Sequence, residues 1–389
     1  MKEFFPIFNN NSNLIYFDNA STTQKPSVLL DALKEVYYVH YSNVHRGMYE
    51  LSEKITEMYE LARQKVAKFI NAKPTEIIFT SGTTEAINLV ANSLKLSGVL
   101  SKSSKILLTE MEHHANIIPW QNISKNIFYL KIDDNFHVDF SSISNSIKFD
   151  LVSISLVSNV LGTYVNIGDI HKFKNSKTFL MVDAAQFAPH SMIDVKKMQV
   201  DALVFSAHKM FGPTGLGILF LKEQWGKTLL PSKVGGGIVR TVNKYKSEFV
   251  DTPWRFEAGT PPIASAITFA RIIDFIESNH LLSRRLDLRN YLLTQLQNIS
   301  ELRIFHDVSI DAFPIISFMH PNIHAHDIAW FLGKNNICVR AGHHCAQILH
   351  RDVLKVPATV RVSFSVYNNQ NEVDKFIDVL KKCIVLYSK

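Results

Sequence analysis

Short, almost wholly apolar runs recur through the first two-thirds of the chain, and they constrain the fold more than any other feature. They predict strands at residues 76–80, 105–109, 151–156, 179–182, 202–205 and 217–221. Strands that lack polar alternation are typical of a parallel sheet covered on both faces. Helical patterns lie between them, at 52–70 and at 85–96. This alternation predicts an α/β fold with ligand groups at the carboxyl ends of the strands.

The pattern changes after residue 260, where helices and strands no longer alternate. It predicts helices at 263–279 and 282–299, followed by strands near 313–319 and 360–364. We interpret this part as a smaller α+β domain. The predicted division is a large domain over 20–260 and a small domain formed by 1–19 with 261–389.

The composition is that of a large globular protein without a nucleic-acid surface. Of the 389 residues, 46% are hydrophobic and 20% are charged, which allows a sizeable core. The net charge of +7 comes from scattered lysines and arginines, and no basic stretch alternates with aromatic residues. Such a diffuse excess is usually a solvated surface, so we expect no nucleic-acid partner.

The cysteines and the N-terminus favour a reducing compartment. The chain has three cysteines, Cys338, Cys345 and Cys383, without the clustered spacing of a disulfide framework. Glu3 and Pro6 interrupt the apolar start, so it lacks the core of a signal peptide. No run approaches the roughly 18 apolar residues of a membrane span. We expect a cytoplasmic protein that does not bind membranes.

The segment Arg340-Ala-Gly-His-His-Cys-Ala346 places Cys345 in a loop of small residues beside an arginine and two histidines. Nearby positive charge favours the nucleophilic thiolate. Two other interpretations stay open, a zinc site that also uses His114 and an inert core thiol. For Cys338 and Cys383 we favour the packed core thiol.

Three strand ends carry polar side chains where the apolar run stops. They supply Asp183 and Gln186 at one end, Ser206, His208 and Lys209 at a second, and Ser81, Thr83 and Thr84 at a third. The third runs into a helix N-terminus, where free N–H groups and the helix dipole suit an anion. An acid, a lysine and a phosphate cradle are the parts that hold pyridoxal phosphate, with the lysine as Schiff-base partner. Singly, each has an ordinary explanation as a helix cap, a surface lysine or a turn.

Nine motifs in order resemble the pyridoxal-phosphate-dependent cysteine desulfurases, specifically the SufS-like group of the class-V aminotransferase family, which also shows selenocysteine lyase activity. They are Tyr16-Phe-Asp-Asn-Ala20, Val44-His-Arg-Gly47, Gly82-Thr-Thr-Glu85, Met111-Glu-His-His-Ala-Asn116, Val157-Ser-Asn-Val-Leu-Gly-Thr163, Val182-Asp-Ala-Ala-Gln186, Ser206-Ala-His-Lys-Met-Phe-Gly-Pro-Thr-Gly215, Trp254-Arg-Phe-Glu-Ala-Gly-Thr260 and Arg340-Ala-Gly-His-His-Cys-Ala346. The resemblance implies the fold-type I transferase architecture, with a mainly parallel sheet in the large domain and the active cysteine on the small domain. It departs from the family at Pro261-Pro262-Ile263 and at Gln347-Ile348.

The resemblance also implies roles for individual residues. Lys209 would form the Schiff base and Asp183 would pair with the pyridine nitrogen, while His113 would stack on the ring and transfer protons. The remaining cofactor contacts would come from Gln186, Thr83, Thr84, Ser206 and His208, with Thr260 from the second subunit of a homodimer. Substrate contacts would come from Asn159, Arg361 and Arg340, with His45 and Arg46 reaching across from the partner subunit.

The implied reaction converts L-cysteine to L-alanine and leaves a persulfide on Cys345. The sulfur would pass to an acceptor protein of the SufE or SufU type for iron–sulfur cluster assembly. Three alternatives remain: a selenocysteine lyase, an aminotransferase, which would not need Cys345, and a sulfur-carrier or metal-binding scaffold that has lost the cofactor.

Overall fold

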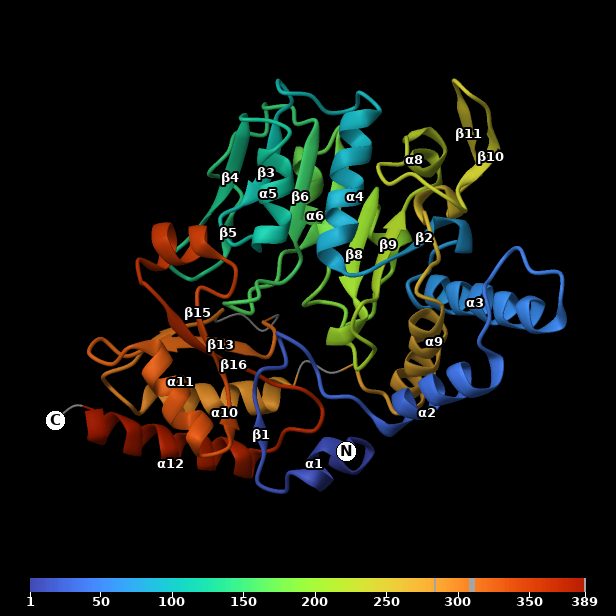
Figure 1. Cartoon of the computed structure of the whole chain (residues 1–389). Helices are drawn as coiled ribbons and strands as arrows, with labels where there is room; N and C mark the ends of the chain where they lie inside the picture. The colour runs from blue at the N-terminus through green and yellow to red at the C-terminus, as the bar shows by residue number, and fades with distance from the viewer. Residues whose placement is uncertain (283–284, 308–311, 388–389) are drawn as a thin grey trace.

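The computed structural model describes residues 1–282, 285–307 and 312–387. It contains two main sheets, a large one and a small one (Figure 1). Among these residues, no helix has both the length and the apolar content needed to cross a membrane.

The large sheet has the strand order β2-β9-β8-β7-β6-β3-β4-β5. In that order the strands are Ile77–Thr80, Gly217–Leu221, Ala202–Ser206, Phe179–Asp183, Leu151–Ser155, Ile106–Thr109, Ile127–Ile132 and Val138–Asp139. The five strands from β8 to β4 are parallel, whereas β9 runs antiparallel to both its neighbours and β5 antiparallel to β4. All six predicted strands are confirmed. The sequence missed β4 and β5, because β4 lies toward the edge with mostly half-buried side chains and lacks the fully apolar signature.

Helices cover both faces of the large sheet, which explains its apolar strands. Val182, Leu203 and Phe205 belong to one core cluster, shared with α3 (Glu50–Phe69) and α9 (Ile263–Ser278). The alternate residues of the same strands belong to the cluster that includes α4 (Thr83–Leu96). Helices predicted at 52–70, 85–96 and 263–279 are therefore confirmed within a few residues.

The small sheet is antiparallel, with the order β12-β13-β16-β15. Its strands are Arg303–Phe305, Ile315–Met319, Thr359–Ser363 and Arg340–Gly342, and its core is shared with α10 (Leu286–Gln297), α11 (Ala325–Lys334) and α12 (Gln370–Tyr387). The strands predicted at 313–319 and 360–364 are confirmed. The helix predicted at 282–299 begins at Leu286, and its positions 283–284 lie outside the described residues.

The N-terminal segment crosses to the small sheet and back. Strand β1 (Ile15–Tyr16) pairs in parallel with β14 (Ile337–Cys338), and the chain then enters α2 (Ser27–Glu35). Helix α9 packs against α2 and α3, on the side of the large sheet. The domain division at residues 19 and 261 stays a prediction. The remaining helices and strands are short: α1 Pro6–Asn10, α5 Ile118–Gln121, α6 Ile167–Ile170, α7 Val195–Met198, α8 Glu223–Thr228, β10 Val239–Val242 and β11 Ser247–Phe249.

Candidate active site

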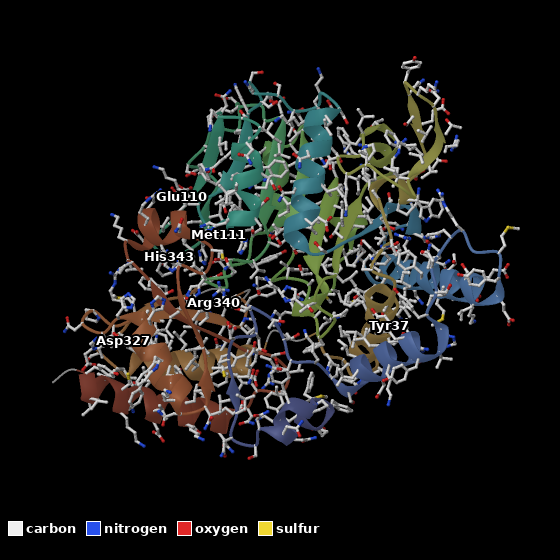
Figure 2. The ribbon with its side chains drawn as sticks, viewed as in Figure 1. Tyr37, Glu110, Met111, Asp327, Arg340 and His343 are labelled. Carbon is white, nitrogen blue, oxygen red and sulfur yellow. The ribbon has the colours of Figure 1, made fainter. Side chains whose placement is uncertain are left out.

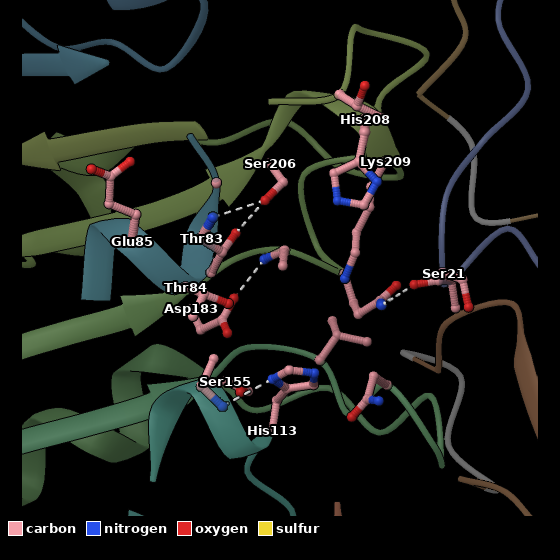
Figure 3. Close-up of a pocket in the computed structure, with 18 of the residues that line it drawn as sticks. Ser21, Thr83, Thr84, Glu85, His113, Ser155, Asp183, Ser206, His208 and Lys209 are labelled. Carbon is pink, nitrogen blue, oxygen red and sulfur yellow. Dashed lines mark hydrogen bonds between the residues drawn. The ribbon is translucent and has the colours of Figure 1, made fainter. Parts of the chain in front are cut away.

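A cavity of about 460 Å³ lies where the carboxyl ends of β7 and β8 meet the N-terminus of α4, and residues of β15 and β16 also line it (Figure 3). It brings together most of the predicted site residues: Thr83, Thr84, His113, Asn159, Asp183, Gln186, Ser206, His208, Lys209, Arg340 and Arg361. The lining of this cavity, as far as the structure describes it, does not include four predicted site residues: Cys345, His45, Arg46 and Thr260.

One end of the cavity has the polar groups of an anion site. The Ser206 hydroxyl accepts a hydrogen bond from the Thr83 N–H at 2.9 Å and lies 2.7 Å from the Thr83 hydroxyl (Figure 3). Thr83 opens the 14-residue helix α4, so the partial positive charge of the helix faces this end. A Cβ on Gly217 would lie 2.4 Å from the Gly82 Cα, so only glycine lets strand β9 approach this turn.

Lys209 and Asp183 form the charged centre of the cavity. Lys209 ends the 3-10 turn Ala207–Lys209, directly after β8, and its side chain reaches into the pocket (Figure 3). Burial lowers the pKa of Lys209 to about 8, and the charge of Asp183 opposes part of that fall. Burial raises the pKa of Asp183, while a hydrogen bond from the Ala185 N–H at 2.8 Å and the charge of Lys209 lower it. A lysine with this pKa keeps a useful fraction of neutral amine near neutral pH.

The backbone beside Lys209 is held by residues that the sequence reasoning missed. The His208 carbonyl accepts hydrogen bonds from the Thr22 hydroxyl, from the Thr23 hydroxyl and N–H, and from the Lys25 Nζ at 2.8 Å. The segment directly after the Tyr16-to-Ala20 motif therefore fixes the turn that carries Lys209. These four hydrogen bonds to one carbonyl form only in the tertiary fold, so no pattern in the sequence predicts them.

His113 lines the cavity as a neutral ring. Its Nδ1 accepts a hydrogen bond from the Ala115 N–H at 3.1 Å, so the lone pair is on Nδ1 and the proton on Nε2. Burial lowers the pKa of His113 to about 3, and the nearby charge of Lys209 adds to the effect.

Glu112, which the sequence reasoning also missed, anchors the turn that carries His113. Its fully buried carboxylate accepts hydrogen bonds from the Thr109 hydroxyl, the Asn116 amide, and the N–H and hydroxyl of Ser155. Burial raises the pKa of Glu112 to about 7, and these hydrogen bonds offset part of the cost of a buried charge.

Arg361, in β16, is fully buried and lines the cavity. Its Nη1 donates to the Asn159 carbonyl at 2.9 Å, and its Nη2 donates to Asp18 at 3.0 Å and to the Ser21 hydroxyl at 2.8 Å. Its Nε has no hydrogen-bond partner among the described residues. The amide of Asn159 donates to the His344 carbonyl at 2.6 Å. Asp18 and Ser21 thus belong to the surroundings of the predicted carboxylate site.

Cys345 lies between β15 and the π-helical turn Leu349–Leu354, beside the cavity. Its thiol is half-buried, and the Arg340 Nη2 lies 3.8 Å from its Sγ. The Cys345 carbonyl accepts from the His114 N–H at 2.7 Å, and the His114 Nε2 accepts from the Gln347 N–H at 3.1 Å. His114 therefore hydrogen-bonds to the cysteine loop through both its backbone N–H and its ring. Of the other two cysteines, Cys383 is fully buried, whereas Cys338 is half-buried in β14.

A second cavity, of about 490 Å³, collects the residues predicted to act across a subunit interface. It is lined by His45, Arg46, Trp254, Glu257 and Thr260, together with glycines of the segment before β10. These residues lie apart from the lining of the first cavity.

Comparison with known proteins agrees with this architecture. The family model described as "Aminotransferase class-V" matches residues 15–376. A probable cysteine desulfurase of Halalkalibacterium halodurans is 39% identical, with 98% of this chain and 97% of the relative covered. A cysteine desulfurase of Haloferax volcanii is 36% identical, with 96% of this chain and 90% of the relative covered.

Solved structures of the same kind are similar over nearly the whole chain. A cysteine desulfurase of Thermococcus onnurineus, solved in its apo form, has a TM-score of 0.92 and 35% identity, covering 100% of this chain and 97% of that one. The cysteine desulfurase CsdA of Escherichia coli has a TM-score of 0.88 and 29% identity, covering 99% and 98%. The chain therefore has the class-V aminotransferase fold and belongs to that family, among the cysteine desulfurases.

Proposed function

We propose that this protein is a cysteine desulfurase that converts L-cysteine to L-alanine and takes the sulfur onto Cys345. The observation that carries the proposal is one cavity with a buried amine on Lys209, a buried acid on Asp183 and an anion site at Thr83, with a thiol beside it. The family membership supports the same chemistry.

The residues of the cavity fit pyridoxal phosphate. Thr83 and Ser206 would hold the phosphate at the start of α4, aided by Thr84 and His208 and by Thr260 of a second subunit. Asp183 would keep a proton on the pyridine nitrogen, Gln186 would contact the ring hydroxyl, and His113 would lie against the ring. When bound, the cofactor supplies an electron sink for a carbanion formed at the Cα of cysteine.

Arg361 is the residue best suited to hold the substrate carboxylate. Its planar guanidinium lines the cavity, is fully buried and has an Nε without a partner among the described residues. Asn159 and Arg340 would complete the site. Lys209, as a neutral amine, would remove the Cα proton and return it.

In the sulfur step, the sulfur atom of the substrate passes from its Cβ to the thiol of Cys345. The Cys345 thiolate attacks the substrate sulfur, an S–S bond forms and the Cβ–S bond breaks, with its electron pair left on the carbon fragment. That fragment takes up protons and leaves as alanine, so the sum is cysteine plus thiol giving alanine plus persulfide. Arg340, 3.8 Å from the Sγ, would stabilise the attacking anion.

The proposed enzyme works as a homodimer. An exposed group of apolar side chains lies between the end of α2 and the start of α3: Tyr37, Tyr38, Val39, Met48 and Tyr49 (Tyr37 is labelled in Figure 2). Met48 is 97% exposed and Tyr38 79%, which is unusual for a free surface. A second subunit on this face would bring His45, Arg46 and Thr260 to its neighbour's cavity.

The acceptor is part of the same proposal. The segment that carries Cys345 is short and hydrogen-bonded at His344, Cys345 and Gln347. A loop whose backbone is held in this way would keep its thiol beside the cavity, so we propose that an acceptor protein of the SufE or SufU type comes to it for iron–sulfur cluster assembly.

The test is alanine formation from L-cysteine by the protein loaded with pyridoxal phosphate. We expect alanine and, with a reductant, an equal amount of sulfide. Amino-group transfer to a 2-oxo acid without sulfide would instead identify an aminotransferase. Alanine from selenocysteine but not from cysteine would identify a selenocysteine lyase.

A further inference from the structure

Two buried histidines, one in the loop that carries Cys345 and one just after it, share one hydroxyl. The His344 Nε2 lies 3.0 Å from the Thr359 Oγ1, and the His350 Nε2 lies 3.1 Å from the same oxygen. The His350 Nδ1 lies 3.0 Å from the Ala346 carbonyl. We call His344, Thr359 and His350 the histidine relay. All three side chains are buried and none of them lines the described cavities.

The chemistry of these groups allows only one direction for the hydrogen bonds when both rings are neutral. A carbonyl only accepts, so the His350 Nδ1 carries the proton and its Nε2 carries the lone pair. The Thr359 hydroxyl must then donate to the His350 Nε2 and can only accept from His344. His344 therefore carries its proton on Nε2. Burial lowers the pKa of both rings, well below the usual range for His344, which keeps them neutral.

An independent observation agrees with this direction. The His344 Nδ1 is buried and has no hydrogen-bond partner among the described residues. A buried lone pair without a partner is tolerated more readily than a buried N–H without one. The direction deduced from the Ala346 carbonyl puts a lone pair, and not a proton, at this position.

The relay acts on a strained piece of backbone. His344 and Cys345 both have positive φ, 51° and 58°, and neither is a glycine. Such a conformation persists only where surrounding contacts hold it. The histidine relay binds the loop at His344 and Ala346, the residues on either side of Cys345.

We propose that Thr359 and His350 are positioning residues, which fix His344 and Ala346 and so hold the Cys345 thiol where it can take sulfur. This inference rests on the proposed function and deepens it. The charged and titratable groups around the relay are Arg361 and Arg340, which act on His344, and His343, whose ring packs on His350 at 5.7 Å.

The test compares Thr359→Val, which keeps the shape and removes the hydroxyl, with Thr359→Ser, which keeps the hydroxyl. In the loaded protein we expect Thr359→Val to lower the rate of alanine formation about tenfold with KM within about twofold, because the loop no longer holds the thiol in place. The freed thiol should also react at least threefold faster with iodoacetamide. Thr359→Ser should match the native protein in both measurements.

A second variant guards against misfolding. His350→Phe keeps a ring but loses every polar contact, and it should reproduce Thr359→Val. The double variant should add nothing further, because both substitutions break one chain of hydrogen bonds. Melting temperatures identify any variant that fails to fold.

A protein that makes no alanine from cysteine would overturn only the proposed function. Iodoacetamide labelling of Cys345 would still test whether the histidine relay holds the loop. The histidine relay is overturned if Thr359→Val and His350→Phe label Cys345 at the native rate. It is equally overturned if Thr359→Ser behaves like Thr359→Val, since the hydroxyl would then not be responsible.

Discussion

Lys209 and Cys345, the two groups proposed to do the chemistry, are held in very different ways. Lys209 ends the short turn that follows a buried strand, and this turn is fixed by the sheet and by the four hydrogen bonds to the His208 carbonyl. Cys345 lies in a loop with two left-handed residues, and this loop is hydrogen-bonded to the side chains of His114 and Asn159 and to the histidine relay. The sheet fixes the cofactor end of the site, whereas the sulfur end depends on single hydrogen bonds. Substitutions should therefore affect the two ends in different ways.

The largest effect is expected at Lys209. Lys209→Ala removes the proposed base, so the turnover number for alanine formation should fall by about 10³-fold or more. Alanine measured by chromatography gives the rate, and the exposed Lys222→Ala is the matched control. A Lys209→Ala protein that kept a tenth of the native rate would show that Lys209 is not the base.

The phosphate cradle should be the next most sensitive part. In Gly217→Ala, the new Cβ would lie 2.4 Å from the Gly82 Cα, which forces the turn before Thr83 away from β9. We expect the Kd for pyridoxal phosphate to rise about 30-fold, or roughly 2 kcal/mol. Gly333→Ala, where a Cβ meets nothing within 4 Å, should bind as tightly as the native protein. Equal affinity of the two variants would place the phosphate elsewhere.

The pKa of Lys209 predicts how loading depends on pH. Burial lowers this pKa to about 8, and only the neutral amine can bond to the cofactor. The loading rate of the cofactor-free protein should rise about tenfold from pH 7 to pH 9 and level off above the pKa. In Asp183→Asn the midpoint should move to lower pH, because the charge that raises the pKa of Lys209 is gone. A midpoint near 10 in the native protein would contradict a buried amine.

The smallest effect is expected from one hydrogen bond of the loop. His114→Phe removes the acceptor of the Gln347 N–H, and one such bond contributes about 1 kcal/mol, so persulfide formation should slow about fivefold. His114→Gln, which offers a carbonyl oxygen, should recover most of the rate. Rapid-quench measurement of alanine in the first turnover separates this step from later ones. If His114→Phe kept the native rate, the other hydrogen bonds of the loop would be enough to hold it without the ring of His114.

The same contrast explains what the sequence could predict. Asp183 and Ser206 end apolar strands and Lys209 follows three residues after Ser206, so the sequence predicted both the sheet and the cluster at its edge. The roles of these residues stay predictions. The hydrogen bonds of Glu112 and Lys25 join segments 43 and 183 residues apart, and those of Thr359 join β16 to the cysteine loop, so no local sequence pattern predicts them. The sequence also could not predict that β9 runs antiparallel to β8, because an apolar run does not reveal the direction of a strand.

The most direct test of the account is one turnover with L-cysteine, comparing the native protein with Cys345→Ser. The native protein loaded with pyridoxal phosphate should form one alanine per subunit and one persulfide, located on Cys345 by mass spectrometry. Cys345→Ser should form no persulfide and little alanine. Alanine from Cys345→Ser at the native rate, or a persulfide on Cys338 or Cys383 instead, would contradict the claim that Cys345 takes the sulfur.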